Sequence, residues 1–130
     1  ADWLALGRHL FRTGRRADGW RALRNAADLA DGPESARAAL LLARRLARRR
    51  RHRAAEQLLS RVDTRVTREP QLAIARARLL EWSLRDLPGA REVVLDALRH
   101  VPAESPFRVD LEWRLQRLDR KLARPSHSDD

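Results

Sequence analysis

The placement of its helix breakers is the feature that most constrains how this chain can fold. The 130 residues include only five Gly and six Pro, and most of these separate stretches whose apolar side chains recur every three or four positions. That spacing is typical of amphipathic helices rather than strands. It predicts seven helices, over residues 2–13, 17–30, 33–50, 53–66, 70–85, from the 86–89 turn to residue 100, and 106–124.

Several breakers stand where helices commonly begin. Pro33 and Pro70 suit the first helical turn, where the missing N–H leaves no bond unmade. Ser105 followed by Pro106 is typical of an N-cap and its first helical residue. Residues 125–130 carry no apolar side chain, so we predict a disordered tail there.

None of the predicted helices could bury its apolar stripe alone. The last one shows the pattern clearly, with Leu111, Leu115, Leu118 and Leu122 at steps of four, three and four. Trp113 lies off this stripe and either covers the end of the helical array or serves as an exposed anchor for a partner. Short connections imply antiparallel neighbours, and the length suits one domain.

Helices also pair into an internal repeat. A shift of 36 residues places Leu6-Gly7 on Leu42-Ala43, and it places Gly19 on Ala55. A looser third copy follows if the 86–89 turn holds one extra residue. Small residues recur in each copy where the first helix of a pair would cross the second, so the two backbones are expected to approach closely there.

This pattern resembles the tetratricopeptide repeat family, whose repeat combines an aromatic, a Leu-Gly pair and spaced small and large apolar residues. In the first repeat, the matching residues are Trp3, Leu6, Gly7, Leu10, Gly19, Leu23 and Ala26. The resemblance covers about residues 2–103. It implies an all-α, right-handed solenoid of three antiparallel hairpins at about 2–32, 34–67 and 70–103, with a capping helix at 106–124.

A second likeness concerns two later segments. Residues 80–90 and 111–122 are similar to the C-terminal helical region of some bacterial ribonuclease-H-like exonucleases. This resemblance implies an accessory domain of a nuclease, whose catalytic carboxylates would lie outside these residues. Fold likeness alone does not establish such a role.

The net charge of +10 is carried by 27 Arg and a single Lys, which predicts attraction to polyanions. In the tetratricopeptide family the first helix of each pair lines a concave groove. The resemblance therefore implies a partner-binding set on that groove, namely Arg8, Phe11, Arg12, Arg44, Arg48, Arg78 and Trp82. Arg binds carboxylates and phosphates bidentately. A merely solvated, basic helix exterior is the alternative interpretation.

Nothing in the sequence indicates catalysis. There is no Cys, and the four His stand in no recognised metal motif. The acidic residues are expected to be scattered over helix surfaces. We therefore predict no enzymatic site, no cofactor and no metal. No apolar run is long enough for a membrane span, and a cytoplasmic protein is expected. Because the chain lacks Met, we expect a processed product or a fragment.

Three functions remain open. The first is a non-catalytic scaffold that binds an acidic protein segment, or another domain, in an Arg-lined groove. The second is a nucleic-acid-binding accessory domain of a nuclease or related processing protein, whose affinity would fall steeply with salt. The third is a structural spacer or self-association module, so that both a monomer and a weak homodimer are compatible with the sequence.

Overall fold

A computed structural model describes residues 2–30, 32–63 and 69–124. The described residues are helical or lie in turns between helices, and none of them forms a strand. The elements in chain order are α1 (Trp3–Arg12), α2 (Arg16–Leu29), α3 (Pro33–Arg48), α4 (His52–Val62), α5 (Pro70–Arg78), the π-helical turn η2 (Leu79–Ser83), α6 (Leu87–His100) and α7 (Phe107–Ala123).

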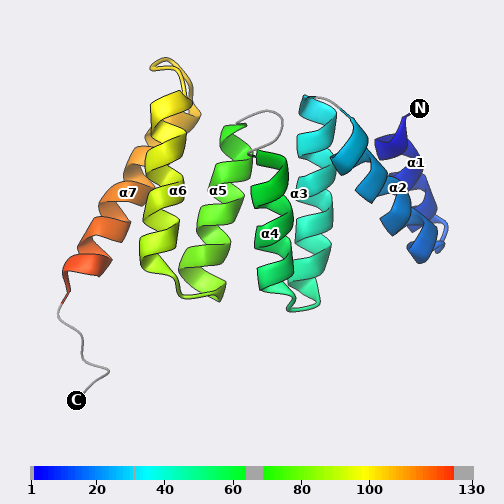
Figure 1. Cartoon of the computed structure of the whole chain (residues 1–130), viewed down its shortest axis with the longest axis horizontal. Helices are drawn as coiled ribbons and strands as arrows, with labels where there is room; N and C mark the ends of the chain where they lie inside the picture. The colour runs from blue at the N-terminus through cyan, green and yellow to red at the C-terminus, as the bar shows by residue number, and fades with distance from the viewer. Residues whose placement is uncertain (1, 31, 64–68, 125–130) are drawn as a thin grey trace.

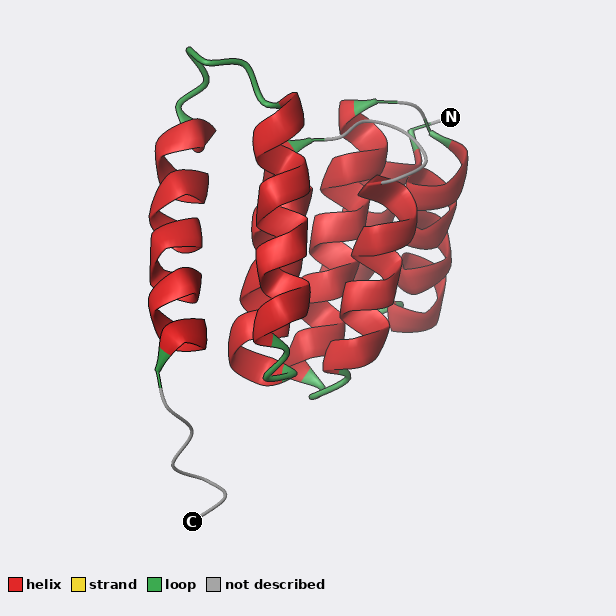
Figure 2. Cartoon of the chain, turned by 60° about the vertical axis from the view of Figure 1, so that its left-hand side comes forward, coloured by secondary structure: helices red, strands yellow, loops and turns green. Residues whose placement is uncertain are grey.

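The helices stand beside one another in a row, with the N-terminal pair at one end and α7 at the other (Figure 1). Consecutive helices run in opposite directions, and each packs against its neighbours in the chain. The view in Figure 2 shows the same array turned, with the final helix standing at its edge. The predicted all-helical class with antiparallel neighbours is therefore confirmed.

Local signals in the sequence account for where the helices begin. The Asp2 carboxylate accepts a hydrogen bond from the Ala5 amide at 3.0 Å, and Asp86 accepts one from the Gly89 amide at 2.9 Å. Pro33 and Pro70 occupy the first turns of α3 and α5, as predicted. The Ser105 hydroxyl accepts a hydrogen bond from the Phe107 amide at 3.2 Å. Helix α7 begins at Phe107, one residue after the predicted start at Pro106.

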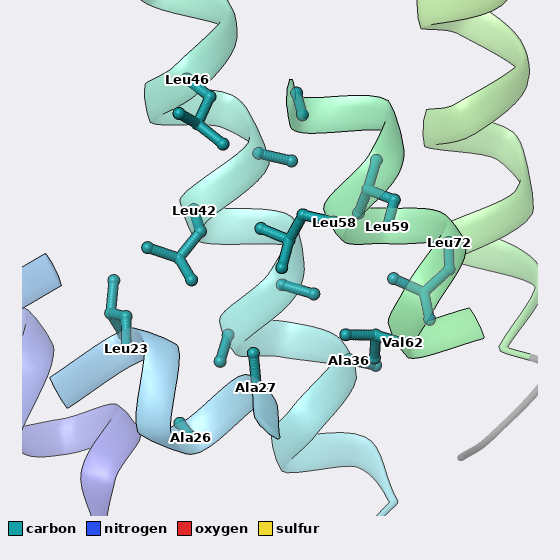
Figure 3. Packing of buried hydrophobic residues seen from close by; sticks show 14 of the residues in the cluster. Leu23, Ala26, Ala27, Ala36, Leu42, Leu46, Leu58, Leu59, Val62 and Leu72 are labelled. Atoms are coloured by element: carbon teal, nitrogen blue, oxygen red, sulfur yellow. The ribbon is translucent and has the colours of Figure 1, made fainter. Parts of the chain in front are cut away.

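Buried apolar side chains form two clusters rather than one. The larger lies among α1 to α4 and reaches Leu72 at the start of α5, with Leu23, Leu42 and Leu59 almost fully buried (Figure 3). The smaller joins the rest of α5 to α6 and α7 around Leu111 and Leu118. Helix α5 thus contributes to both clusters and connects the two halves of the array.

Small residues that the sequence spaces 36 positions apart are buried at helix contacts. Gly7 of α1 faces Leu23 of α2, where an added Cβ would stand only 2.7 Å from the Leu23 side chain. Gly19 of α2 faces the Phe11 ring, and a Cβ added to Gly19 would stand 2.9 Å from that ring. The equivalent Ala43 and Ala55 are buried between α3 and α4. Side chains larger than these would push the paired helices apart.

One expectation for α7 needs correction, and one is narrowed. Leu122 continues the Leu stripe in the sequence but is 41% exposed, because the stripe runs past the last side chains that pack against it. Trp113 is 63% exposed, which favours the second of its two interpretations, an exposed anchor, over a side chain that covers the end of the array. The predicted end of the fourth helix falls partly in residues 64–68, and the predicted disordered tail at 125–130 also lies outside the described residues.

Candidate functional site

The residues predicted to bind a partner lie on one side of α1, α3 and α5, which we call the α1–α3–α5 face. The structure brings most of them together around two hollows, each formed between the first helices of neighbouring pairs. Arg48 is exposed on the same side of α3 but lines neither hollow. Helical spacing explains this arrangement, since residues four apart stand on one face.

The first hollow, between α1 and α3, has a volume of about 240 Å³. It is lined by the predicted Arg8, Phe11 and Arg12, together with Arg45, which sequence reasoning missed. The Arg45 guanidinium lies 3.6 Å from the centre of the Phe11 ring. This cation–π contact fixes the guanidinium at the rim of the hollow while leaving its N–H groups available to a ligand.

The second hollow, between α3 and α5, is larger at about 440 Å³. Its lining combines Arg44, Arg78 and Trp82 with small and apolar side chains that include Leu40, Ala43 and Ala75. Among the described residues, no carboxylate lines this hollow. An apolar hollow flanked by two guanidinium groups can accept an apolar side chain and bind anionic groups beside it.

Positive charges are concentrated around Arg45 without compensation. The pKa of the Arg45 guanidinium is lower than its ordinary value. Partial burial is the largest cause, and repulsion from Arg48, Arg16 and Arg49 adds to it. Within the described parts of the chain, no carboxylate lies within ion-pair distance of Arg45, Arg48 or Arg49. A bound anion would relieve this repulsion.

Charge differs sharply between the two halves of the sequence. Residues 1–53 contain 14 Arg and only five acidic residues, whereas residues 54–130 contain 14 Lys or Arg and 13 acidic residues. Residues 1–53 are the shorter segment, so basic residues are denser there and acidic residues are sparser. Both differences contribute to the contrast, and α1 to the start of α4 carries nearly the whole net charge.

In the second half, acidic residues are used to hold helices together. Arg76 of α5 contacts Glu56 of α4 at 3.1 Å and Asp63 at 3.0 Å, and all three side chains are at most 15% exposed. The Arg91 and Asp119 side chains connect α6 to α7 at 2.6 Å. Because these cations already have partners, they are poorer candidates for binding an external anion.

The prediction that acidic residues lie on helix surfaces is most clearly wrong for Glu81. The acidic residues were expected on helix surfaces, yet the Glu81 carboxylate is 1% exposed and contacts Arg117 at 2.7 Å and Lys121 at 2.6 Å. Burial raises its pKa, but the hydrogen bonds from both cations outweigh burial and hold the pKa below its ordinary value. The π-helical turn places this carboxylate inward, and Asp63 is a second buried exception.

The same turn leaves Trp82 56% exposed beside the second hollow. Lys121 Nζ lies 3.7 Å from the centre of the Trp82 ring, and the Arg117 guanidinium carbon lies 5.6 Å from it. Cation–π contacts from α7 therefore fix the position of the indole. The one sequence signal for this arrangement is the spacing of Arg117 and Lys121, which places both cations on one side of α7.

Among the residues that the structure describes, no group of three or more His, Asp or Glu side chains is placed to hold a metal ion. No helix in the described ranges is both long and apolar enough to cross a membrane. Comparisons of the chain with protein-family models, curated proteins and solved structures find no match.

Proposed function

We propose that this protein is a non-catalytic binding scaffold whose α1–α3–α5 face holds an acidic segment of a partner protein. The proposal includes a tetratricopeptide-like arrangement, in which α1–α2, α3–α4 and α5–α6 are successive hairpins and α7 caps the last one. The small residues Gly7, Ala43 and Ala77 support this arrangement, since all three are buried at equivalent positions of the proposed repeats.

The observation that carries the proposal is the pair of adjacent hollows on this face, which are rimmed by guanidinium groups and lined by no carboxylate. An extended acidic segment running across α1, α3 and α5 would pass Arg8 and Arg12, then Arg44, then Arg78. Each carboxylate could accept two hydrogen bonds from one guanidinium. The apolar lining between α3 and α5 would take a Leu or aromatic side chain of the same segment.

The proposed site would act by electrostatic attraction and by burial of one apolar side chain. Opposite charges would raise the association rate, and this contribution falls with ionic strength. The apolar contact between α3 and α5 is much less sensitive to salt. A peptide that carries both features should therefore keep part of its affinity in salt, whereas a purely acidic peptide should lose most of it.

The experiment is a fluorescence anisotropy titration with labelled acidic peptides that do or do not contain a central Leu. Arg44→Glu combined with Arg48→Glu should abolish binding while the circular dichroism spectrum and melting temperature stay close to those of the native chain. Arg120→Glu with Arg124→Glu makes the same change in net charge at the end of α7 and is the matched control. Retained binding in the first variant, or equal loss in both, would contradict the proposal.

The sequence also left open an accessory domain of a ribonuclease-H-like exonuclease and a self-association module. No feature of the described residues favours a nuclease as the parent protein. A nucleic-acid contact is instead supported by a separate basic surface on the other side of α3. For self-association, the exposed Trp113 and Val109 on α7 are the candidates, and a concentration-dependent mass in sedimentation would be its mark.

A further inference from the structure

A second set of hollows lies between α2, α3 and α4, on the side of α3 opposite to Arg44 and Arg48. Two hollows of about 300 and 340 Å³ share Trp20, Arg24, Leu46 and Arg51, so they form one continuous depression. We call it the α2–α4 trough. Its basic and aromatic lining consists of Trp20, Arg21, Arg24, Arg49, Arg51 and Arg61.

The trough is strongly basic and poorly neutralised. Asp28 is the one carboxylate among the described residues of its lining, and Arg61 already contacts that carboxylate at 3.0 Å. Arg21 lies 3.7 Å from Asp18. For Arg24, Arg49 and Arg51, the described residues supply no acidic partner within ion-pair distance. Three exposed guanidinium groups are thus available to an anion along one depression.

An aromatic surface accompanies these charges. Trp20 is half-buried, meets the Phe11 ring edge-on at 6.1 Å between ring centres, and has the Arg49 guanidinium 5.4 Å from its own ring centre. The indole is therefore held in a fixed position between α2 and the end of α3. A planar base can stack on such a ring or on the guanidinium plane, and stacking of this kind tolerates any base.

The turn that joins α3 to α4 extends the basic surface. Arg50 adopts a φ of +61°, a left-handed conformation in which glycine is the favoured residue at a helix C-terminus. Hydrogen bonds from the Arg50 amide to the Ala47 carbonyl and from the Arg51 amide to the Leu46 carbonyl, both 2.9 Å, fix the turn. A glycine here would be less strained, and the exposed Arg50 side chain adds a further cation beside the trough.

From these observations we propose that the α2–α4 trough, together with the Arg49–Arg51 turn, binds the phosphate backbone of a single-stranded nucleic acid. A single strand carries one phosphate per nucleotide, and Arg24, Arg49 and Arg51, which have no acidic partner among the described residues, could contact several of these phosphates along one depression. Trp20 can stack only on a base that is not already paired in a duplex. An acidic polypeptide offers the charges but lacks the bases, and it is the competing occupant in the test.

The test measures anisotropy of labelled oligo-uridine with the full chain across a salt series, and a duplex of equal length and a poly-Glu peptide serve as competitors. Arg24→Glu with Arg51→Glu should lower the affinity at least tenfold. It should also reduce the slope of log K against log salt by about two, one for each lost phosphate contact. Arg44→Glu with Arg48→Glu changes net charge equally on the α1–α3–α5 face and should have a clearly smaller effect.

Arg50→Gly separates binding from folding. This variant should melt no lower than the native chain, because glycine suits the left-handed turn, yet it should bind oligo-uridine more weakly. Equal losses from the two Glu pairs would overturn the proposal, since affinity would then follow net charge alone. Absent binding to oligo-uridine, preference for the duplex, or full competition by poly-Glu would also overturn it. None of these outcomes affects the acidic-peptide site, which is tested with its own ligand.

Discussion

Replacing Glu81 with Gln tests how the last helix is held to the rest of the array. The Glu81 carboxylate is 1% exposed and accepts hydrogen bonds from Arg117 at 2.7 and 2.9 Å and from Lys121 at 2.6 Å. Gln keeps the shape and one acceptor but removes the negative charge. The two cations would then lose their partner while keeping their places on α7.

The magnitude follows from how far these cations can return to water. Breaking a fully buried ion pair costs about 3–5 kcal/mol, because a charge is left in a dry environment. Here the Arg117 and Lys121 side chains are 36% and 25% exposed, so both can be partly rehydrated. We therefore expect a loss of about 2 kcal/mol, which lowers Tm by roughly 6–10 °C for a chain of this length.

Thermal and urea unfolding followed by circular dichroism would measure this loss. Glu92→Gln is the matched control, since Glu92 is exposed on α6, and its effect should stay within about 0.5 kcal/mol. If Glu81→Gln and Glu92→Gln unfold alike, the buried pair does not hold α7, and the reasoning from burial is wrong. A loss of helical signal confined to the α7 region would refine the same conclusion by showing local unfolding.

Further predictions follow from the same core and ion pairs. Because the pKa of Glu81 is lowered in the folded chain, its stabilising effect is present above the ordinary carboxyl pKa and is lost as the pH falls through the lowered value. Acid unfolding curves of Glu81→Gln should therefore depend less on pH than those of the native chain. Leu111→Ala should cost about 2–4 kcal/mol in urea unfolding and Leu122→Ala less than about 1 kcal/mol, since Leu111 is fully buried and Leu122 is 41% exposed. Gly7→Ala should lower the free energy of unfolding by about 1 kcal/mol, because overpacking against Leu23 outweighs the gain in helix propensity. Equal stability of the two Leu variants, or a more stable Gly7→Ala chain, would contradict the described packing.

The sequence predicted the helices well because their signals are local. Proline in the first turn and the spacing of apolar residues depend on a few neighbouring positions, and the structure has Pro33 and Pro70 in the first turns of α3 and α5 as expected. The close approach at Gly7 was also predictable, since a repeated small residue at a fixed period indicates a helix crossing. Several helix ends and starts differ from the prediction by one or two residues, and the predicted fifth helix continues as the π-helical turn after Arg78.

The candidate site was less predictable because it depends on which helices become neighbours. Arg45 lies one position away from Arg44 in the chain, yet it belongs to the other hollow, and only the packing of α3 against α1 shows this. Glu81 is buried because the π-helical turn rotates it toward two cations that lie 36 and 40 residues further along the chain. No periodicity in the sequence marks either of these placements.

The most direct test of the proposed function is a residue-resolved map of where an acidic peptide contacts the chain. Amide NMR spectra of the isotopically labelled protein, recorded as a Leu-containing acidic peptide is added, provide that map. We predict shifts concentrated on α1, α3 and α5 around Arg12, Arg44 and Arg78, with α7 little affected beyond its contact with Trp82. Shifts spread evenly over all exposed Arg residues, or centred on the outer side of α7, would contradict the account.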